Sequence, residues 1–546
     1  MKSSNRAGKT LRISWFLLFA LVFTAQVVPG IYENSPTDDE PIELTNGYFY
    51  WRGDVVTHNF HPPLPKMLQA LPLRLKKLED STPPSFTENQ LRAYHFLFVS
   101  NRKDFELMTR CGRWVSLFFG IGIGLLLFFQ TRRGNPVTAF AALGLWSFHP
   151  TLLAYSGLAM ADITVSFFVL AAVLVFQRHL EKPGPRWALA AGSLAGLAAC
   201  SKFSALALVP IFAALEVLQH FHKGNPGGNP VRIPWTTDWL YGTLGFFGVI
   251  SLIYLPGTLF QTEHRFPMVY FLRGLKNMAD YSDYHHPTYF LGRCSRQNHW
   301  LYFPVAFLLK NTIVFTLLVL IAVWEGLRKK TSYPAWMWVT PLAFSLAILP
   351  VQNLGVRYLL PAVPFLILMV SKAAGEGWEE RKRAGKLLVA GLFLWNALSV
   401  LANGPDLIGY FNDLVPAEKK VYYLADSDLD MGQDVKRLAL WGRQRGWKQV
   451  KLAQFGGALD PSFYGLACVP WTRKDLSGPQ PGQVYAVNVT LFQTGPVFSP
   501  ELLPIARSWA SATPPTGRVG DSWIYFEMPG KTVPDPSPSL SSISIF

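Results

Sequence analysis

The residues best suited to chemistry lie in a polar stretch directly after the first hydrophobic run. The stretch opens with three consecutive carboxylates, Asp38, Asp39 and Glu40, and ends in the sequence HPPLPK, which contains His61 and Lys66. A carboxylate beside a bilayer is costly to desolvate, so its presence indicates a task such as deprotonating a hydroxyl or holding a cation. A solvated acidic loop is the alternative for the triplet alone, and the HPPLPK that follows favours a site.

The composition places these residues in a membrane protein. Half of the 546 residues are hydrophobic and 16% are charged, and the apolar residues form blocks long enough to cross a hydrocarbon layer of about 30 Å. A net charge of +15 would suggest nucleic acid in a soluble chain. Here many basic residues lie in short links between the blocks, as the positive-inside rule expects. Membrane lipids or a phosphate-bearing lipid are therefore the expected partners, and nucleic acid is not.

We predict about 11 transmembrane helices in a multi-pass protein of the cell membrane. The first is the apolar run that begins at Ile13, for which a cleaved signal peptide is the alternative. With the amino terminus in the cytoplasm, every inner link is basic, so this topology is self-consistent. The other spans are predicted at 112–130, 136–155, 160–179, 187–200, 203–220, 239–258, 303–324, 335–350, 358–371 and 386–402.

The same topology brings distant residues to the outer, extracytoplasmic face. A long first outer loop, residues 31–110, carries the acidic triplet. Its segment PPLPKMLQALPLRLKKL has the spacing of an amphipathic helix, either lying on the membrane surface or packed on the loop's own core. Asp162, Lys202 and Arg357 fall at span ends on this face. An Asp at a span end usually marks a cavity or a pair with another helix.

Residues 403–533 are predicted to form an extracytoplasmic α/β domain. Apolar runs (KVYYLAD, VKLAQF, QVYAVNV, SWIYFEM) alternate with one helical stretch, GQDVKRLALWGRQRG, and with Gly and Pro. The tail, 534–546, is expected to be disordered. The spacing of Asp426, Asp430 and Asp434 lacks the Gly and final Glu of a calcium loop, so we interpret them as a capped helix start.

The order of these motifs resembles the phospholipid carrier-dependent glycosyltransferases with the GT-C fold, which include protein O-mannosyltransferases and lipid A aminoarabinose transferases. In that superfamily the first outer loop carries an Asp-Glu pair and then a basic or His residue with Pro-Pro-Leu, which DE at 39–40 and HPPL at 61–64 match. The resemblance covers about the whole chain. It continues through RCGRWVSLFFG, HPTLLAYSGLAMAD, AAGSLAGLAACSKFSALALVP, NHWLYFPVAFLLKNT and RYLLPAVPFL. The run DSDLDMGQD departs from its counterpart at Asp428 and Met431, where relatives have Asn and Trp.

This resemblance implies a GT-C transmembrane domain over residues 1–402 that uses a polyprenyl-phosphate sugar as donor. It implies an inverting single displacement, with Asp39 as the general base and Glu40 orienting the acceptor or the base. The departing phosphate needs cationic side chains. The candidates for that role are Arg357, Lys202, Arg110 and Arg113. The predicted substrate-binding set also includes His61, Lys66 and Asp162.

The sequence leaves the cofactor, the transferred group, the acceptor and the function class open. No cofactor is expected, and a divalent cation between Asp39 and the phosphate is the alternative. The transferred group is a hexosyl or pentosyl unit, and the acceptor is a protein, a lipid or a glycan. A polytopic transporter or lipid flippase is the competing function, and it predicts ionisable residues at mid-span and broken helices. A silent scaffold whose outer domain binds partners is a third interpretation.

Overall fold

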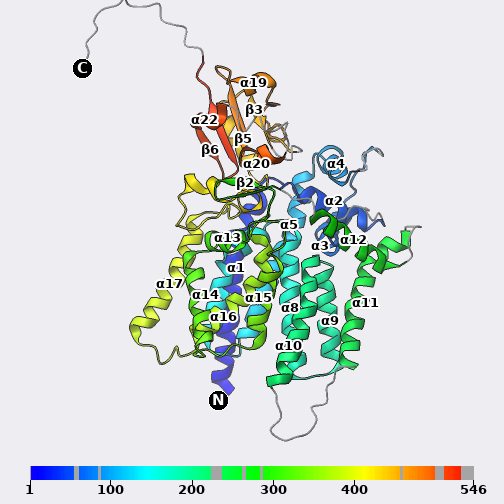
Figure 1. Ribbon diagram of the computed structural model, residues 1–546, viewed down its shortest axis with the longest axis vertical. Helices are drawn as coiled ribbons and strands as arrows, with labels where there is room; N and C mark the ends of the chain where they lie inside the picture. Colours follow the sequence, from blue (N-terminus) through cyan, green and yellow to red (C-terminus); the bar gives the residue numbers. More distant parts are fainter. Residues whose placement is uncertain are drawn as a thin grey trace, which may run out of the picture. The chain divides into compact units, whose positions relative to one another are not determined.

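The computed structural model describes residues 2–53, 61–83, 88–222, 237–260, 266–282, 287–454, 459–498 and 509–530. The chain divides into two compact units, Met1–Gln433 and Asp434–Phe546. Figure 1 shows the first as a bundle of long helices and the second as a small sheet with short helices. The tail predicted to be disordered, 534–546, lies outside the described residues.

Long apolar helices dominate the first unit. Within the described ranges, seven helices are long and apolar enough to cross a membrane, or up to nine if each of two bent pairs counts as one span. Large apolar side chains such as Leu21, Phe118 and Leu252 are about two-thirds exposed on them, which suits contact with lipid. The chain is a multi-pass membrane protein. The seven lie in α1 (Lys2–Glu33), α5 (Phe105–Thr131), α8 (Ala161–Glu181), η3 with α10 (Phe203–Ala207, Leu208–His222), α11 (Thr237–Phe260), η4 with α16 (Val356–Ala362, Val363–Gly375) and α17 (Arg383–Ala402).

The bent pairs fall on two predicted spans. α6 (Pro136–Ser147) meets α7 (Pro150–Ser156) at 57°, and α13 (Tyr302–Lys310) meets α14 (Ile313–Leu327) at 119°. The first break follows from Pro150, which has no backbone N–H to continue a helix. Two further predicted spans, 187–200 and 335–350, correspond to shorter helices. These are α9 (Pro185–Ala199) and α15 (Ala335–Ala347).

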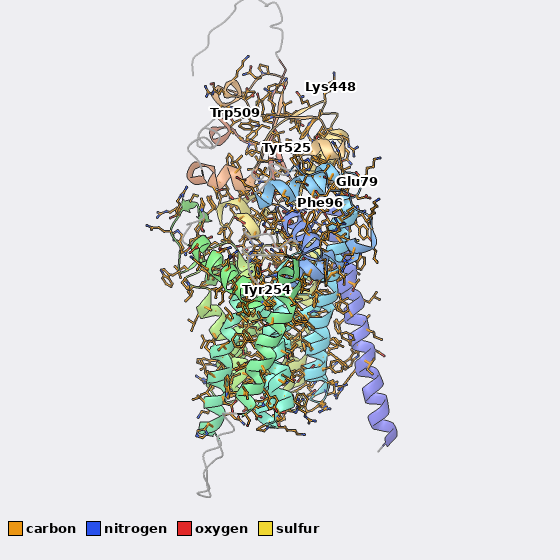
Figure 2. All side chains as sticks on the ribbon, turned by 90° about the vertical axis from the view of Figure 1, so that its right-hand side faces the viewer. Glu79, Phe96, Tyr254, Lys448, Trp509 and Tyr525 are labelled. Atoms are coloured by element: carbon orange, nitrogen blue, oxygen red, sulfur yellow. The ribbon has the colours of Figure 1, made fainter. Side chains whose placement is uncertain are left out.

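The long loop between α1 and α5 folds into short helices that lie together at one end of the bundle (Figure 1). Glu79 and Phe96 of this loop lie above Tyr254 of α11 in the view of Figure 2. The helices are α2 (Glu40–Tyr50), α3 (Leu64–Ala70), η1 (Leu71–Leu75), α4 (Asn89–Tyr94) and η2 (His95–Ser100). The amphipathic helix α12 (Pro267–Ser282) follows α11 and packs against it.

The segment predicted to be amphipathic packs on the core of its own loop. Lys66 is 3% exposed and Gln69 is fully buried, and Gln69 Nε2 donates to Ser116 Oγ (3.0 Å) and Met160 O (2.9 Å). Of the two interpretations of this segment, packing on the loop's own core is therefore the one observed, and Lys66 is a buried residue and not an exposed polar edge. Its side chain points into the loop, because Glu43 of α2 offers it a charge partner there.

The crossing of α2 over α3 depends on Gly47. A Cβ at this position would lie 1.9 Å from the backbone oxygen of Lys66, so α2 and α3 would have to separate. We expect Gly47→Ala to destabilise the first unit by about 1–3 kcal/mol, the usual cost of overpacking. The measurement is thermal unfolding in detergent, with Gly391→Ala as the control because a Cβ there meets nothing within 4 Å. Equal melting temperatures for the two variants would contradict this packing.

The boundary between the units differs from the predicted one at 402/403. Residues 403–433 belong to the helical unit, because Lys310 Nζ donates to Ile408 O (2.8 Å) and to Asp428 O, and Asn412 N–H donates to Leu309 O (2.9 Å). KVYYLAD, predicted as a strand, is residues 420–426, of which the first three end η5 (Ala417–Tyr422) and the last begins η6 (Asp426–Asp428). The run is not part of the sheet of the second unit.

The second unit contains the predicted small α/β structure. Its five-stranded sheet has the order β4-β3-β5-β7-β6. β3 runs parallel to β4 and β5, whereas β7 is antiparallel to β5 and β6. Three predicted runs and the helical stretch match β3, β5, β7 and α18. The elements are α18 (Val435–Gln444), β3 (Val450–Ala453), η7 (Pro461–Tyr464), β4 (Cys468–Pro470), α19 (Arg473–Ser477), β5 (Val484–Asn488), α20 (Val489–Phe498), α22 (Trp509–Ala512), β6 (Gly517–Val519) and β7 (Trp523–Glu527). The predicted fold class is confirmed.

Candidate active site

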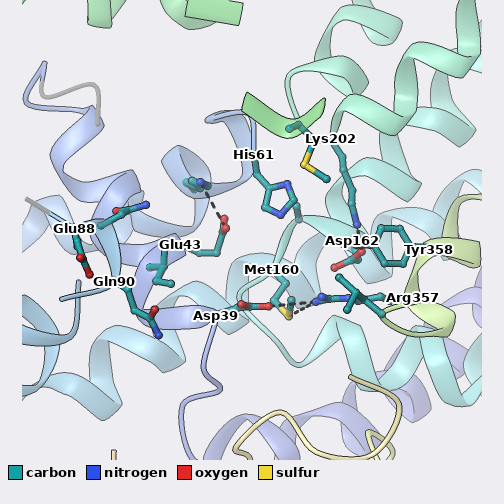
Figure 3. A pocket seen from close by; sticks show the side chains of 16 residues that line it. Asp39, Glu43, His61, Glu88, Gln90, Met160, Asp162, Lys202, Arg357 and Tyr358 are labelled. Atoms are coloured by element: carbon teal, nitrogen blue, oxygen red, sulfur yellow. Dashed lines mark hydrogen bonds and ion pairs between the residues drawn. The ribbon is translucent and has the colours of Figure 1, made fainter. Parts of the chain in front are cut away.

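A cavity of about 530 Å³ lies in the first unit, where the outer-loop helices meet the ends of the long helices. Its walls come from α2, the HPPLPK turn, α4, the start of α8, the α9–η3 junction and η4 (Figure 3). Segments from very different parts of the sequence thus form one polar pocket. The predicted site residues that line it are Asp39, His61, Lys66, Asp162, Lys202 and Arg357.

Asp39 stands at the amino end of α2. Pro41 follows in the first turn and Asp39 makes no side-chain cap bond, so its carboxylate is not held by the helix end. Arg357 Nη1 lies 3.3 Å from Asp39 Oδ2. The side chain of Asp39 is 48% exposed, and an ion pair this open to solvent contributes about 0–1 kcal/mol. The carboxylate can therefore leave Arg357 at little cost and accept a proton from a substrate.

Glu40 and Arg113 form a fully buried ion pair away from the cavity. Arg113 Nε and Nη2 donate to Glu40 Oε1 (2.8 Å) and Oε2 (2.7 Å). The same carboxylate accepts from the N–H groups of Thr37 (2.9 Å) and Ala159 (2.7 Å). With every acceptor used internally, Glu40 has no position from which to touch an acceptor substrate, and Arg113 none from which to touch a phosphate. The pair fixes the backbone on which Asp39 sits.

Arg110 also lies outside the cavity lining. Its guanidinium pairs with Glu106 one turn earlier on α5 and lies over the ring of Tyr32 at 5.0 Å. Arg110 and Arg113 come from the same helix, but the structure does not bring either to the cations of the cavity. Of the four basic residues expected at a phosphate, Lys202 and Arg357 are the ones that line the cavity.

Lys202 and Asp162 form a buried pair on the cavity wall. Lys202 Nζ donates to Asp162 Oδ1 at 2.8 Å and lies 4.3 Å from the centre of the Tyr358 ring. An ammonium has three donors, so Lys202 keeps capacity for a further acceptor. The backbone at Lys202 is extended between α9 and η3, and Leu64 N–H donates to Cys200 O (3.1 Å). This bond ties the HPPLPK turn to the Lys202 junction.

Arg357 is held by the segment DSDLDMGQD. Asp428, which is fully buried, accepts from the N–H of Val356 and from the hydroxyl of Tyr302, both at 2.8 Å. Gly355 adopts φ +129°, and a Cβ there would lie 2.8 Å from Ser427 Oγ. The same segment reaches the other side of the site, since Asp38 N–H donates to Met431 O (3.0 Å). It therefore sets the spacing between the Asp39 turn and the Arg357 turn.

Arg357 retains an unused donor. Its side chain is 13% exposed, and its Nε has no hydrogen-bond partner among the described residues. A buried unsatisfied donor costs about 1–3 kcal/mol, so a bound anion would recover that energy. Together with Lys202 it forms a cationic wall suited to phosphate oxygens.

His61 lies between these cations and Lys66. Burial and the charges of Lys66, Lys202 and Arg357 lower the pKa of His61 to about 3. An imidazole with so low a pKa is uncharged near pH 7, so we do not assign His61 the role of a cation for the phosphate.

This assignment predicts the pH behaviour of His61 variants. In the unfolded chain His61 takes up a proton near its ordinary pKa of about 6.5, and in the folded chain only near about 3. Its contribution to stability is therefore present above pH 6.5 and is lost as the pH falls toward 3. We expect His61→Gln to weaken this acid sensitivity and to retain transfer within about tenfold, measured as melting temperature and kcat/KM between pH 8 and 5. If the charge of His61 took part in the reaction, the kcat/KM of the wild type would instead change around pH 6.5, and the kcat/KM of the variant would not.

Sequence reasoning missed two cavity residues, Glu43 and Tyr358. Glu43 pairs with Lys66 at 3.6 Å, and burial raises the pKa of Glu43 and lowers that of Lys66. The available signal was spacing, because Glu43 lies one helical turn after Asp39 and so shares its face of α2. Tyr358 follows Arg357 directly, and no sequence pattern marked it as a neighbour of Lys202.

No metal centre is evident in this region. The described part of the chain contains no group of three or more His, Cys, Asp or Glu side chains placed to hold a metal ion. Whether a divalent cation joins Asp39 to the phosphate stays a prediction for experiment.

Residues 108–225 match the family model described as dolichyl-phosphate-mannose-protein mannosyltransferase. The predicted resemblance is confirmed. The match supports sugar transfer as the general reaction of this chain. It includes Asp162 and Lys202, whereas Asp39 and Arg357 lie outside it. No curated protein matches the chain.

Solved structures give similarities over longer stretches at low identity. ArnT from Cupriavidus metallidurans in the apo state is 13% identical, with 94% of this chain and 98% of that chain covered and a TM-score of 0.47. The Archaeoglobus fulgidus oligosaccharyltransferase AglB, in complex with an inhibitory peptide and a dolichol-phosphate, is 11% identical. The match covers 89% of this chain and 71% of that chain, with a TM-score of 0.45. The Pmt1-Pmt2 O-mannosyltransferase complex of S. cerevisiae, bound to the sugar donor, is 19% identical. The match covers 50% of this chain and 34% of that chain, with a TM-score of 0.32.

Proposed function

We propose that this protein transfers a hexosyl or pentosyl unit from a polyprenyl phosphate to an acceptor at the outer face of the membrane, with inversion at the anomeric carbon. The observation that supports it best is the placement of a half-exposed carboxylate, Asp39, in the same cavity as Arg357 and Lys202. A base and two cations in one pocket are the groups that such a displacement requires.

The reaction needs few groups. The acceptor hydroxyl gives its proton to Asp39 while its oxygen forms a bond to the anomeric carbon. The bond from that carbon to the phosphate oxygen breaks on the opposite side, and the electron pair leaves with the polyprenyl phosphate. Arg357 and Lys202 stabilise the charge that develops on the phosphate. Glu40 and Arg113 act through the backbone, because they hold the Asp39 turn in place.

The distribution of basic residues supports our assignment of the outer face. The basic links predicted on one side assign the opposite side, with the first outer loop, to the outer face. The phosphate of a lipid donor lies at headgroup level, and Lys202 and Arg357 lie near helix ends. We therefore assign the cavity and the second unit to the extracytoplasmic side, where a protein, lipid or glycan acceptor is available.

A transfer assay distinguishes this function from transport. The purified protein in liposomes is given polyprenyl phosphate carrying a labelled sugar, together with membrane and protein fractions as acceptors. We expect the label to leave the lipid and enter an acceptor. Label that crosses the bilayer while still attached to its polyprenyl phosphate would favour the flippase alternative and contradict the proposal.

A further inference from the structure

The cavity has a second polar wall that phosphate binding does not use. In Figure 3 Lys202, Asp162 and Arg357 lie on one side of Asp39, and Glu43 and Gln90 lie on the other. The second wall is built by α2 and α4 of the outer loop, whereas the first is built by long-helix ends and η4. Two walls of different chemistry indicate that the cavity holds two different chemical groups.

Glu43 is the buried acceptor of this wall. It is 6% exposed, and its Oε1 faces Lys66 Nζ at 3.6 Å, which is longer than a good hydrogen bond. Its Oε2 is buried and has no hydrogen-bond partner within the described residues. Carboxylate oxygens that are buried normally accept hydrogen bonds. A cavity-lining carboxylate with a free oxygen therefore points to a donor supplied by a ligand.

Asn89, at the first position of α4, repeats the same feature. It lines the same cavity, and its Oδ1 is buried without a partner in the part of the chain that the structure describes. The two unpartnered atoms are both acceptors, whereas the unpartnered atom on the opposite wall, Arg357 Nε, is a donor. A phosphate offers acceptors to the cationic wall, but it offers no donor to Glu43 and Asn89 at neutral pH.

The charge of this wall disfavours an anion, because its remaining charged residue, Glu88 at the start of α4, is a carboxylate. Lys66 lies beside Glu43 and is itself 3% exposed, so the pair carries no net charge toward the cavity. Hydroxyl groups of a carbohydrate are neutral donors, which is what both oxygens lack.

We propose that Glu43 and Asn89 accept hydrogen bonds from carbohydrate hydroxyls, with Lys66 as a positioning residue that holds Glu43. The proposal rests on the proposed function, and it makes Glu43 a determinant of sugar recognition distinct from the phosphate site. The hydroxyls belong either to the sugar of the donor or to a glycan acceptor, since both present the same chemistry.

The test separates the sugar from the phosphate. Wild-type protein in nanodiscs is titrated with undecaprenyl phosphate and with undecaprenyl phosphate carrying mannose. The Kd for the bare lipid divided by the Kd for the mannose-carrying lipid measures recognition of the sugar. We expect Glu43→Gln to lower this ratio about tenfold and to leave the Kd for bare undecaprenyl phosphate within twofold. Glu79→Gln, an exposed glutamate outside the cavity lining, is the matched control and should change neither Kd.

A second variant tests whether the loss of sugar recognition is caused by misfolding. Glu43→Gln removes the charge that faces Lys66, so Glu43→Gln is also combined with Lys66→Met, which removes both charges together. The double variant should show a wild-type melting temperature and the same loss of the sugar-dependent ratio.

The outcomes distinguish the sources and the two levels of the proposal. If the wild-type ratio is large and Glu43→Gln lowers it, the donor sugar is the ligand. If Glu43→Gln leaves donor binding unchanged and instead raises the KM for a glycan acceptor about tenfold, the acceptor is the ligand. A variant that changes neither overturns the role of Glu43, whereas a wild-type protein that binds no undecaprenyl phosphate overturns the proposed function itself.

Discussion

Asp39→Asn is expected to lower kcat for sugar transfer by about 10³-fold. A positioned general base contributes roughly 10²–10⁴-fold, and an amide in the same place cannot take the proton of the acceptor hydroxyl. Donor affinity should stay within about threefold, because the phosphate contacts are assigned to Arg357 and Lys202. The measurement is single-turnover transfer of labelled sugar from a polyprenyl phosphate.

The neighbouring carboxylate provides the control for this result. Asp39 is 48% exposed, and its ion pair with Arg357 is screened, so Asp39→Asn should change stability by less than about 1 kcal/mol. Glu40→Gln removes one partner of a fully buried pair and is expected to destabilise the first unit by roughly 3–5 kcal/mol. The variant at Asp39 is thus expected to lose activity and keep its stability, whereas the variant at Glu40 is expected to lose stability. Transfer retained by Asp39→Asn within tenfold of wild type would remove it from the mechanism.

Arg357→Gln should lower kcat/KM for the donor by roughly 10²–10³-fold, the usual cost of losing a charged group that stabilises the transition state. Arg357 has a free donor at Nε and lines the same cavity as Asp39, as the binding of a leaving phosphate requires. Arg357→Lys keeps the charge and loses the planar fork, so an intermediate loss is expected. The binding of undecaprenyl phosphate without sugar should weaken in the same order.

Arg110→Gln is the matched control for the phosphate site. Arg110 was also expected at the phosphate, but the structure pairs it with Glu106 on α5 outside the cavity lining. Its loss should leave kcat/KM within about twofold. A loss as large as that of Arg357→Gln would show that the phosphate binds elsewhere.

The sequence predicted the elements of the site better than their pairing. The Asp39 turn, HPPLPK, Asp162, Lys202 and Arg357 stand next to hydrophobic runs, and such runs mark helix ends reliably. Which of the basic residues shares a cavity with Asp39 depends on rotation about helix axes. Arg110 and Arg113 of α5 therefore looked equivalent to Lys202, although Arg113 is fully buried against Glu40.

Contacts between helices that are far apart in the chain could not be predicted from the sequence. Lys66 looked like the polar edge of a surface helix, and its burial depends on the close approach of α3 to α2 at Gly47. The extension of the first unit to Gln433 depends on Lys310 and Asp428, which are 118 positions apart. Patterns of a few residues carry no information on such pairs.

The central claim is that Asp39 and the cations of Lys202 and Arg357 share one transfer site. A structure of the Asp39→Asn variant with a polyprenyl-phosphate sugar bound tests it most directly. We expect phosphate oxygens within hydrogen-bond distance of both Arg357 and Lys202, with the anomeric carbon facing position 39. A phosphate bound away from this cavity, or a sugar turned away from position 39, would contradict it.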